Sequence, residues 1–353
     1  MSILIASDFH CKYQKVVWMD TETGEIQSAD VSHQDVQAVR KFFSQFPAGS
    51  VLGMETSGYS HWFEEMVLEL GLELRIGNSE EIASKRTRRQ KNDHRDAELM
   101  LQLLVIGQFP TVWRPSPANR EQRKVIGQRC RLVRMHTQWT NALRALSYNY
   151  NVLLKRGPLS RKNRERVKQI AMSQVLGQER DEMLSWIEQL HQAIAIKNEQ
   201  LERWVAENAT VQRLTTIPGI GPCTALAATL ILGPVERFRN AKCVVAYVGL
   251  DCCEQSTDNA HKKRRYGHIS KQGNRLLRWL LIQCATTATN HNPSMRRVYS
   301  RLCHRKDWRI AKTAVARKLL VCLYVLLRDG IDYPEFVRRG PGIGMPVRAT
   351  GLK

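Results

Sequence analysis

The chain has 353 residues and a mass of 40.6 kDa, enough for about two domains and for a core that needs no disulfide or structural metal. Hydrophobic residues make up 43% and charged residues 25%, which is ordinary for a folded protein and excludes a disordered or collagen-like chain. The formal charge of +21 is not ordinary, and it predicts a polyanionic partner.

Strand and helix patterns alternate through the predicted amino-terminal domain, residues 1–110. The predicted strands are Ile3–Ser7, Tyr13–Met19, Glu25–Val31, Ser50–Met54 and Leu72–Ile76. A helix is expected after Asp35, where apolar residues recur at helical spacing, and another at Trp62–Leu70. Three strands followed by helix, strand, helix and strand predict an α/β layer fold.

The rest of the chain is predicted to be almost entirely helical. Residues 111–213 form a basic helical and coiled-coil region, in which 114–168 carry a net charge of +13. Apolar residues alternate at spacings of four and three through Glu182–Asn208, which predicts the seam of a coiled coil or helical hairpin. An ordinary amphipathic helix is the alternative. A second globular domain is expected at 214–336, mainly α-helical, followed by a tail at 337–353.

The nine cysteines are scattered and contain no CxxC pair, which argues against a disulfide framework or a zinc finger. No apolar run approaches the roughly 18 residues of a membrane span, and the first residues lack the pattern of a signal peptide. We therefore expect a cytoplasmic, nucleoid-associated protein with no membrane partner.

Four carboxylates stand where the predicted elements would bring them together. Asp8 and Glu55 lie at the ends of two strands, and Asp93 and Asp96 are three residues apart on one helix face. Carboxylates gathered at one sheet edge repel one another unless divalent cations lie between them, and oxygen ligands favour Mg²⁺ or Mn²⁺. A pair of such ions would serve phosphoryl transfer.

Two further stretches suggest contacts with phosphate. Ile217–Pro222 reads as a helix-hairpin-helix-like turn, in which the backbone at Gly219 and Gly221 and the start of the next helix can hold a phosphate. A plain packing corner remains the alternative. The second stretch is Gly249–Arg278, which contains four consecutive cations. Along it and the basic helical region, the expected nucleic-acid contacts are Arg123, Lys124, Arg131, Arg134, Arg144, Lys262, Lys263, Arg264, Arg265 and Lys271.

Ser256 and Ser270 flank the cationic run 262–265. A serine hydroxyl beside such cations could attack a phosphodiester, because they stabilise charge on the phosphoryl oxygens. Each serine alone is as readily explained as a turn former or a helix cap.

Several segments follow one another along the chain: the Asp8 strand, Glu55 within Glu-Thr-Ser-Gly, the segment Lys91–Ala97, the helical insert, Pro218–Gly221 and the stretch from Gly249-Leu250 to Arg278. In this order they resemble the DEDD transposases of bacterial insertion sequences, which are bridge-RNA-guided recombinases. The resemblance implies an RNase H-like (RuvC-like) domain whose Mg²⁺ ligands are Asp8, Glu55, Asp93 and Asp96. It also implies a carboxy-terminal transposase domain with a nucleophilic serine, best matched by Ser256. Thr257-Asp258 follows that serine where a glycine is commoner, so Ser270 stays an alternative.

The resemblance further implies a structured guide RNA, donor and target DNA, and a homodimer that assembles into a homotetramer. We predict an RNA-guided transposase that cuts and rejoins DNA through a phosphoserine intermediate with Mg²⁺. A metal-dependent Holliday-junction nuclease without a serine nucleophile is one alternative, and a non-catalytic nucleic-acid-binding protein is another.

Overall fold

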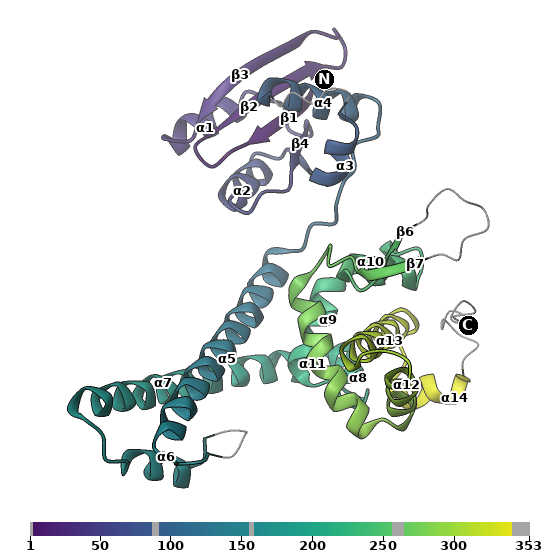
Figure 1. Cartoon of the computed structure of the whole chain (residues 1–353). Helices are drawn as coiled ribbons and strands as arrows, with labels where there is room; N and C mark the ends of the chain where they lie inside the picture. The colour runs from purple at the N-terminus through teal and green to yellow at the C-terminus, as the bar shows by residue number, and fades with distance from the viewer. Residues whose placement is uncertain (1–2, 87–91, 155–158, 256–264, 341–353) are drawn as a thin grey trace. The chain divides into compact units, whose positions relative to one another are not determined.

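The chain divides into two units, Met1–Pro115 and Ser116–Lys353, each with its own hydrophobic core (Figure 1). This computed structural model describes residues 3–86, 92–154, 159–255 and 265–340. Among these residues, no helix is both long enough and apolar enough to cross a membrane.

The first unit is built on a five-stranded sheet in the order β3-β2-β1-β4-β5. Its strands are β1 (Ile3–Phe9), β2 (Tyr13–Asp20), β3 (Ile26–Ser32), β4 (Val51–Glu55) and β5 (Glu73–Gly77). β1, β2 and β3 pair antiparallel in sequence, whereas β4 joins β1, and β5 joins β4, in parallel. All five predicted strands are confirmed, with ends shifted by no more than two residues.

Helices cover both faces of this sheet. They are α1 (Val36–Phe43), α2 (His61–Glu69), α3 (Ser79–Ser84) and α4 (Asp93–Val105). Because successive side chains of a strand point to opposite faces, Ile5 packs into the core formed with α1 and α2, while Ala6 packs into the core formed with α3 and α4. The mixed α/β class is therefore confirmed, and the face that carries Ala6 is the one that matters for the candidate site.

The second unit is mostly helical, as predicted. Its helices are α5 (Pro117–Asn149), α6 (Arg161–Lys168), α7 (Gln174–Ala206), α8 (Ala209–Thr215), α9 (Pro222–Leu232), the 3₁₀ turn Val235–Arg237, α10 (Ala241–Val248), α11 (Arg275–His291), α12 (Pro293–Cys303), α13 (Trp308–Asp329) and α14 (Tyr333–Arg339). α13 is the central helix of the core, and its apolar run is buried nearly all round.

The apolar stripe of α7 is covered by α5 of the same chain. Met183 and Ile187 are buried in one cluster with Leu143 of α5, and Leu201 is buried in the main core with Ile126 of α5. Of the structures that the spacing allowed, the helical hairpin is therefore the one present within the chain (Figure 1).

A two-stranded antiparallel sheet in the second unit escaped the sequence analysis. It consists of β6 (Cys252–Gln255) and β7 (Arg265–Ile269). Both strands are short, and β7 contains Gly267, which has no side chain. Neither therefore shows the apolar alternation in sequence that identifies a strand. The predicted residues Ser256, Lys262, Lys263 and Arg264 belong to the sequence between these strands and lie outside the described residues.

Gly249 ends α10 in the left-handed conformation, with φ of +72°. A Cβ atom there would lie 2.2 Å from the Gln272 carbonyl oxygen, so the α10 end and the segment before α11 touch backbone to backbone. In contrast, Gly127 lies within α5 and has open space around its Cα.

We expect Gly249→Ala to lower the free energy of unfolding by about 3 kcal/mol, because it combines a positive φ with a clash against backbone. The matched control, Gly127→Ala, should raise it by about 0.5–1 kcal/mol, because alanine favours a helix interior. Urea unfolding followed by circular dichroism measures both. Equal effects of the two substitutions would contradict the close backbone packing at Gly249.

Candidate metal and nucleic-acid sites

The four predicted carboxylates of the first unit come together on one face of its sheet. Asp8 shares the face of Ala6 on β1, and Glu55 shares the face of Val51 on β4, which is the face that α4 covers. β1 and β4 run parallel with Ser7 opposite Met54, so Asp8 and Glu55 occupy the next position on neighbouring strands.

Asp93 and Asp96 reach this face from the first turn of α4. The helix starts there because the Asn92 side chain accepts a hydrogen bond from the backbone N–H of His94, at 3.0 Å. Negative side chains in a first turn are stabilised by the unpaired N–H groups of the helix start. Local sequence thus supports both aspartates at this end of α4.

Two residues that the sequence analysis did not select, His10 and Tyr13, bridge part of the cluster. His10 Nε2 lies 3.3 Å from Asp8 Oδ2 and 3.4 Å from Asp93 Oδ2. The Tyr13 hydroxyl donates a 2.7 Å hydrogen bond to the same Asp93 oxygen. The available signal was the two-residue spacing of Asp8 and His10, which puts both on one face of a strand.

Arg86 bridges the other two carboxylates, and it too was missed. Its Nε lies 3.0 Å from Asp96 Oδ1, and its Nη2 lies 3.8 Å from Glu55 Oε1. Arg86 is separated from Asp96 by ten positions and stands among other basic residues, so nothing in the sequence distinguishes it.

Burial destabilises the ionised form of these acids, and the neighbouring cations offset this only in part. It raises the pKa of Asp8 and of Glu55 above the usual carboxyl range, and the neighbouring carboxylates raise both further against the opposing effects of His10 and Arg86. Asp96 is only 6% exposed. One buried oxygen on each of these three acids lacks a hydrogen-bond partner among the described residues: Asp8 Oδ2, Glu55 Oε1 and Asp96 Oδ2.

This donor set fits a divalent cation. Ligand atoms of Asp8, His10 and Asp93 all lie within 4.8 Å of one another, which is close enough to share one ion. The oxygens of Glu55 and Asp96 that accept no hydrogen bond add hard ligands of the kind that Mg²⁺ and Mn²⁺ prefer. The acidic group can therefore hold a metal ion.

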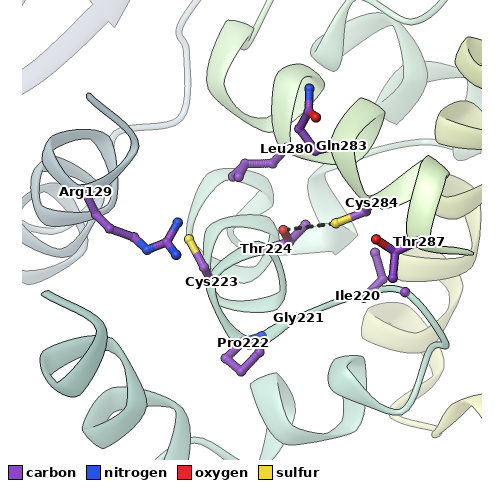
Figure 2. A pocket seen from close by; sticks show the side chains of 11 residues that line it. Arg129, Ile220, Gly221, Pro222, Cys223, Thr224, Leu280, Gln283, Cys284 and Thr287 are labelled. Atoms are coloured by element: carbon purple, nitrogen blue, oxygen red, sulfur yellow. Dashed lines mark hydrogen bonds between the residues drawn. The ribbon is translucent and has the colours of Figure 1, made fainter. Parts of the chain in front are cut away.

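In the second unit, the predicted turn lies between α8 and α9. Gly219 has φ of +97°, and a Cβ atom there would lie 2.5 Å from the backbone nitrogen of Ala288 in α11. The turn therefore packs directly on α11. Beside it is a pocket of about 530 Å³, whose wall includes the start of α9 and the guanidinium of Arg129 (Figure 2).

The predicted nucleic-acid-binding cations of α5 differ in how exposed their side chains are. Lys124, Arg131 and Arg134 are exposed, and Arg144 is half-buried beside the Asn141 side-chain oxygen at 3.0 Å. Arg123 is half-buried as well, and its guanidinium donates to the Leu230 carbonyl at the end of α9. This bond ties α5 to α9, so Arg123 has a structural role whether or not it also meets nucleic acid.

Ser270 lies just after β7, where its hydroxyl donates a 2.5 Å hydrogen bond to Asp251 Oδ1 and its backbone N–H donates to the Asp251 carbonyl. The cap of α11 is Asn274, which accepts from the backbone N–H of Leu277. Ser270 therefore closes the β6–β7 hairpin at its base and does not cap the following helix. The exposed Lys271 follows it with φ of +57°.

Comparison with known proteins finds one family model and several transposases that are similar to this chain. Residues 211–300 match the family model "Transposase IS116/IS110/IS902 family". A probable family 20 transposase of Pseudomonas aeruginosa is 27% identical over 82% of this chain and 87% of its own. The transposase for insertion sequence element IS1111A of Coxiella burnetii is 26% identical over 69% and 66%, and that for IS1328 of Yersinia enterocolitica is 26% identical over 67% and 70%.

These matches identify the chain as a DNA transposase, of the class encoded by insertion sequences. Within it, residues 211–300 are similar to the IS116/IS110/IS902 transposase family. The family-matched segment contains the Gly219 turn, the β6–β7 hairpin and most of α11 and α12, and its helices form much of the main core of the second unit.

We expect Mg²⁺ at about 100 times its Kd to raise the free energy of unfolding by roughly 2.7 kcal/mol, because it binds the folded carboxylate cluster. Asp96→Asn should remove most of this gain. Glu98→Gln is the matched control, since Glu98 lies on α4 two residues away and pairs with His94 at the surface. The gain should shrink as pH falls, because the raised pKa values let protons compete for Asp8 and Glu55.

Thermal unfolding with and without Mg²⁺, together with calorimetric titration, measures this binding. If Asp96→Asn and Glu98→Gln respond to Mg²⁺ as the unsubstituted chain does, the cation binds elsewhere.

Proposed function

We propose that this transposase is an RNA-guided DNA recombinase that cuts and rejoins DNA through a phosphoserine intermediate, with Mg²⁺ held by Asp8, Glu55, Asp93 and Asp96. The observation that carries the proposal is the carboxylate cluster on the α4 face, in which three buried oxygens accept no hydrogen bond among the described residues. A purely structural cluster would supply hydrogen-bond donors to these oxygens, because an unsatisfied buried polar group costs stability.

We further propose that the first unit is an RNase H-like (RuvC-like) domain. Three antiparallel strands followed by two parallel strands, with helices on both faces, support this fold. So does the position of the acids, on two adjacent central strands and one helix that covers them.

In the proposed reaction, the Ser256 oxygen forms a bond to phosphorus, and the bond to one sugar oxygen breaks. The bound Mg²⁺ would supply Lewis-acid stabilisation of the phosphoryl oxygens. The chain's own residues prepare the site: His10 and Tyr13 fix the Asp93 carboxylate, and Arg86 orients Glu55 and Asp96. Rejoining reverses the step when a new sugar hydroxyl displaces the serine oxygen.

The proposed partners are donor and target DNA and a structured guide RNA, which supplies the choice of sequence by base pairing while the protein holds backbones. The exposed cations of α5 and the basic segment 296–318 support a polyanion along these helices. We propose a homodimer that assembles into a homotetramer, so that acidic and serine sites from different copies combine.

A serine nucleophile leaves the protein joined to a DNA end, whereas attack by water does not. Suicide DNA substrates should therefore trap a protein–DNA adduct that survives SDS, detected by gel shift and by mass spectrometry of the modified peptide. Ser256→Ala should abolish it. Ser270→Ala should keep the adduct and cost about 1–2 kcal/mol of stability, because it removes the hydrogen bond to Asp251.

Two outcomes would change the mechanism. An adduct lost in Ser270→Ala but kept in Ser256→Ala would move the nucleophile to Ser270. Cleavage in Mg²⁺ without any adduct would favour the metal-dependent nuclease, in which water attacks.

The exposed cations of α5 generate a separate prediction about affinity. Replacing Lys124, Arg131 and Arg134 together by glutamine should weaken duplex DNA binding regardless of sequence. It should also flatten the plot of log affinity against log salt concentration by about 0.9 per lost phosphate contact. Arg123→Gln is the matched control: it should lower stability, through loss of the bond to Leu230, more than it changes this slope. An unchanged slope in the triple variant would place the DNA on other residues.

A further inference from the structure

Trp308 is the most exposed tryptophan of the chain. It is the first residue of α13 and is 53% exposed, against 38% for Trp186, which comes next. Trp186 packs on another ring of the α5–α7 hairpin, because its centroid lies 4.4 Å from that of Trp139. Ile310, two residues after Trp308, is 51% exposed as well. The start of α13 therefore presents apolar surface of a kind that folded proteins usually bury.

This apolar surface lies in a strongly basic part of the chain. Residues 296–318, here called the α12–α13 segment, contain nine lysines and arginines and one acidic residue, Asp307. The Asp307 side chain caps α13, where it accepts a 2.8 Å hydrogen bond from the backbone N–H of Arg309. Arg301 and Arg305, which precede it, are both exposed. The indole is therefore surrounded in sequence by positive charge that a single carboxylate offsets only in part.

Arg309 lies beside the indole ring itself. Its guanidinium carbon is 5.3 Å from the centroid of the Trp308 ring, within the range of a cation–π contact. Both side chains are exposed. An aromatic ring next to a cation is typical of surfaces that hold single-stranded nucleic acid, because a base stacks on the ring while the cation meets a phosphate.

Charge and base accessibility distinguish the possible occupants of this surface. A second copy of the α12–α13 segment would bring two positive surfaces together, and like charges across an interface repel each other. Duplex DNA would satisfy the cations, but its base faces are stacked inside and reach an indole only after unstacking. Unpaired DNA offers both phosphates and open base faces, and DNA is the substrate of the class of enzyme to which the comparisons assign this chain.

We propose that Trp308 and Arg309 form a stacking platform for an unpaired base of single-stranded DNA, whose backbone is held by the cations of the α12–α13 segment. The inference rests on the proposed contact of this segment with nucleic acid, and it adds the form of DNA that is bound there. Strand exchange between two duplexes separates base pairs, so the proposed cutting and rejoining reaction itself produces unpaired DNA.

The test measures binding of a short fluorescent oligo(dT) to the full-length chain by anisotropy, in EDTA so that no DNA is cut. Trp308→Ala should raise the Kd about fivefold or more, the effect of losing one stacked base. Trp308→Phe should restore most of the affinity, because it keeps an aromatic face. The matched control, Ile310→Ala, removes a neighbouring exposed apolar side chain without a ring and should change the Kd by less than about twofold.

Further measurements establish the form of the ligand. Binding of a duplex of the same length should differ little between Trp308→Ala and the unsubstituted chain. Circular dichroism should show the same helical signal for both proteins, since Trp308 lies at the surface. Unchanged binding of oligo(dT) by Trp308→Ala would overturn the proposal, and so would an equal loss of affinity for oligo(dT) and the duplex. A loss for oligo(rU) but not for oligo(dT) would also overturn it, because the partner would then be RNA.

A charge variant separates failure of this inference from failure of the proposed function. Replacing Arg305 and Lys306 together by glutamine should flatten the plot of log affinity for oligo(dT) against log salt concentration by about 0.7 per lost contact. Trp308→Ala removes no charge and should leave this slope unchanged. A flatter slope in the double variant, with full affinity in Trp308→Ala, would overturn the stacking platform alone. An unchanged slope in the double variant would contradict the contact of the whole segment with nucleic acid, and the platform with it.

Discussion

Repulsion between buried carboxylates is the main electrostatic constraint that the first unit must satisfy. Burial raises the free energy of each ionised carboxylate on the α4 face, and repulsion between neighbouring carboxylates raises it further. The fold offsets part of it through the start of α4, through His10 and Tyr13 on one side and through Arg86 on the other. The offset is incomplete, because one buried oxygen each of Asp8, Glu55 and Asp96 accepts no hydrogen bond within the described residues. A site of this kind is costly in stability, and its ligand atoms fit a cation.

The second unit depends on close backbone contact. Gly219 meets Ala288, and Gly249 meets Gln272, at separations that no Cβ atom tolerates. These contacts hold the turn before α9 and the end of α10 against α11 and the segment before it. All four residues fall within the family-matched segment 211–300. The turn before α9 and the end of α10 are therefore held in place at glycine positions, where the backbones approach too closely for a side chain.

The cations of α5 have two different roles, one structural and one at the surface. Arg123 faces the core and bonds the end of α9, while Lys124, Arg131 and Arg134 face outward. A helix that carries both kinds of cation can join the core and present a positive surface at the same time. The count of basic residues alone overstates how many of them are free to meet phosphate.

The sequence by itself determined the α/β order of the first unit, the helical second unit and the candidacy of Asp8, Glu55, Asp93 and Asp96, because these follow from local periodicity and from residues at element ends. The β6–β7 hairpin could not be predicted, since its stability comes from pairing between strands with little pattern of their own. Tertiary structure alone decided that α7 packs on α5 of its own chain. It alone decided, too, that Arg86, His10 and Tyr13 join the carboxylates, because contacts between distant segments depend on how the sheet and helices pack, which no local pattern records.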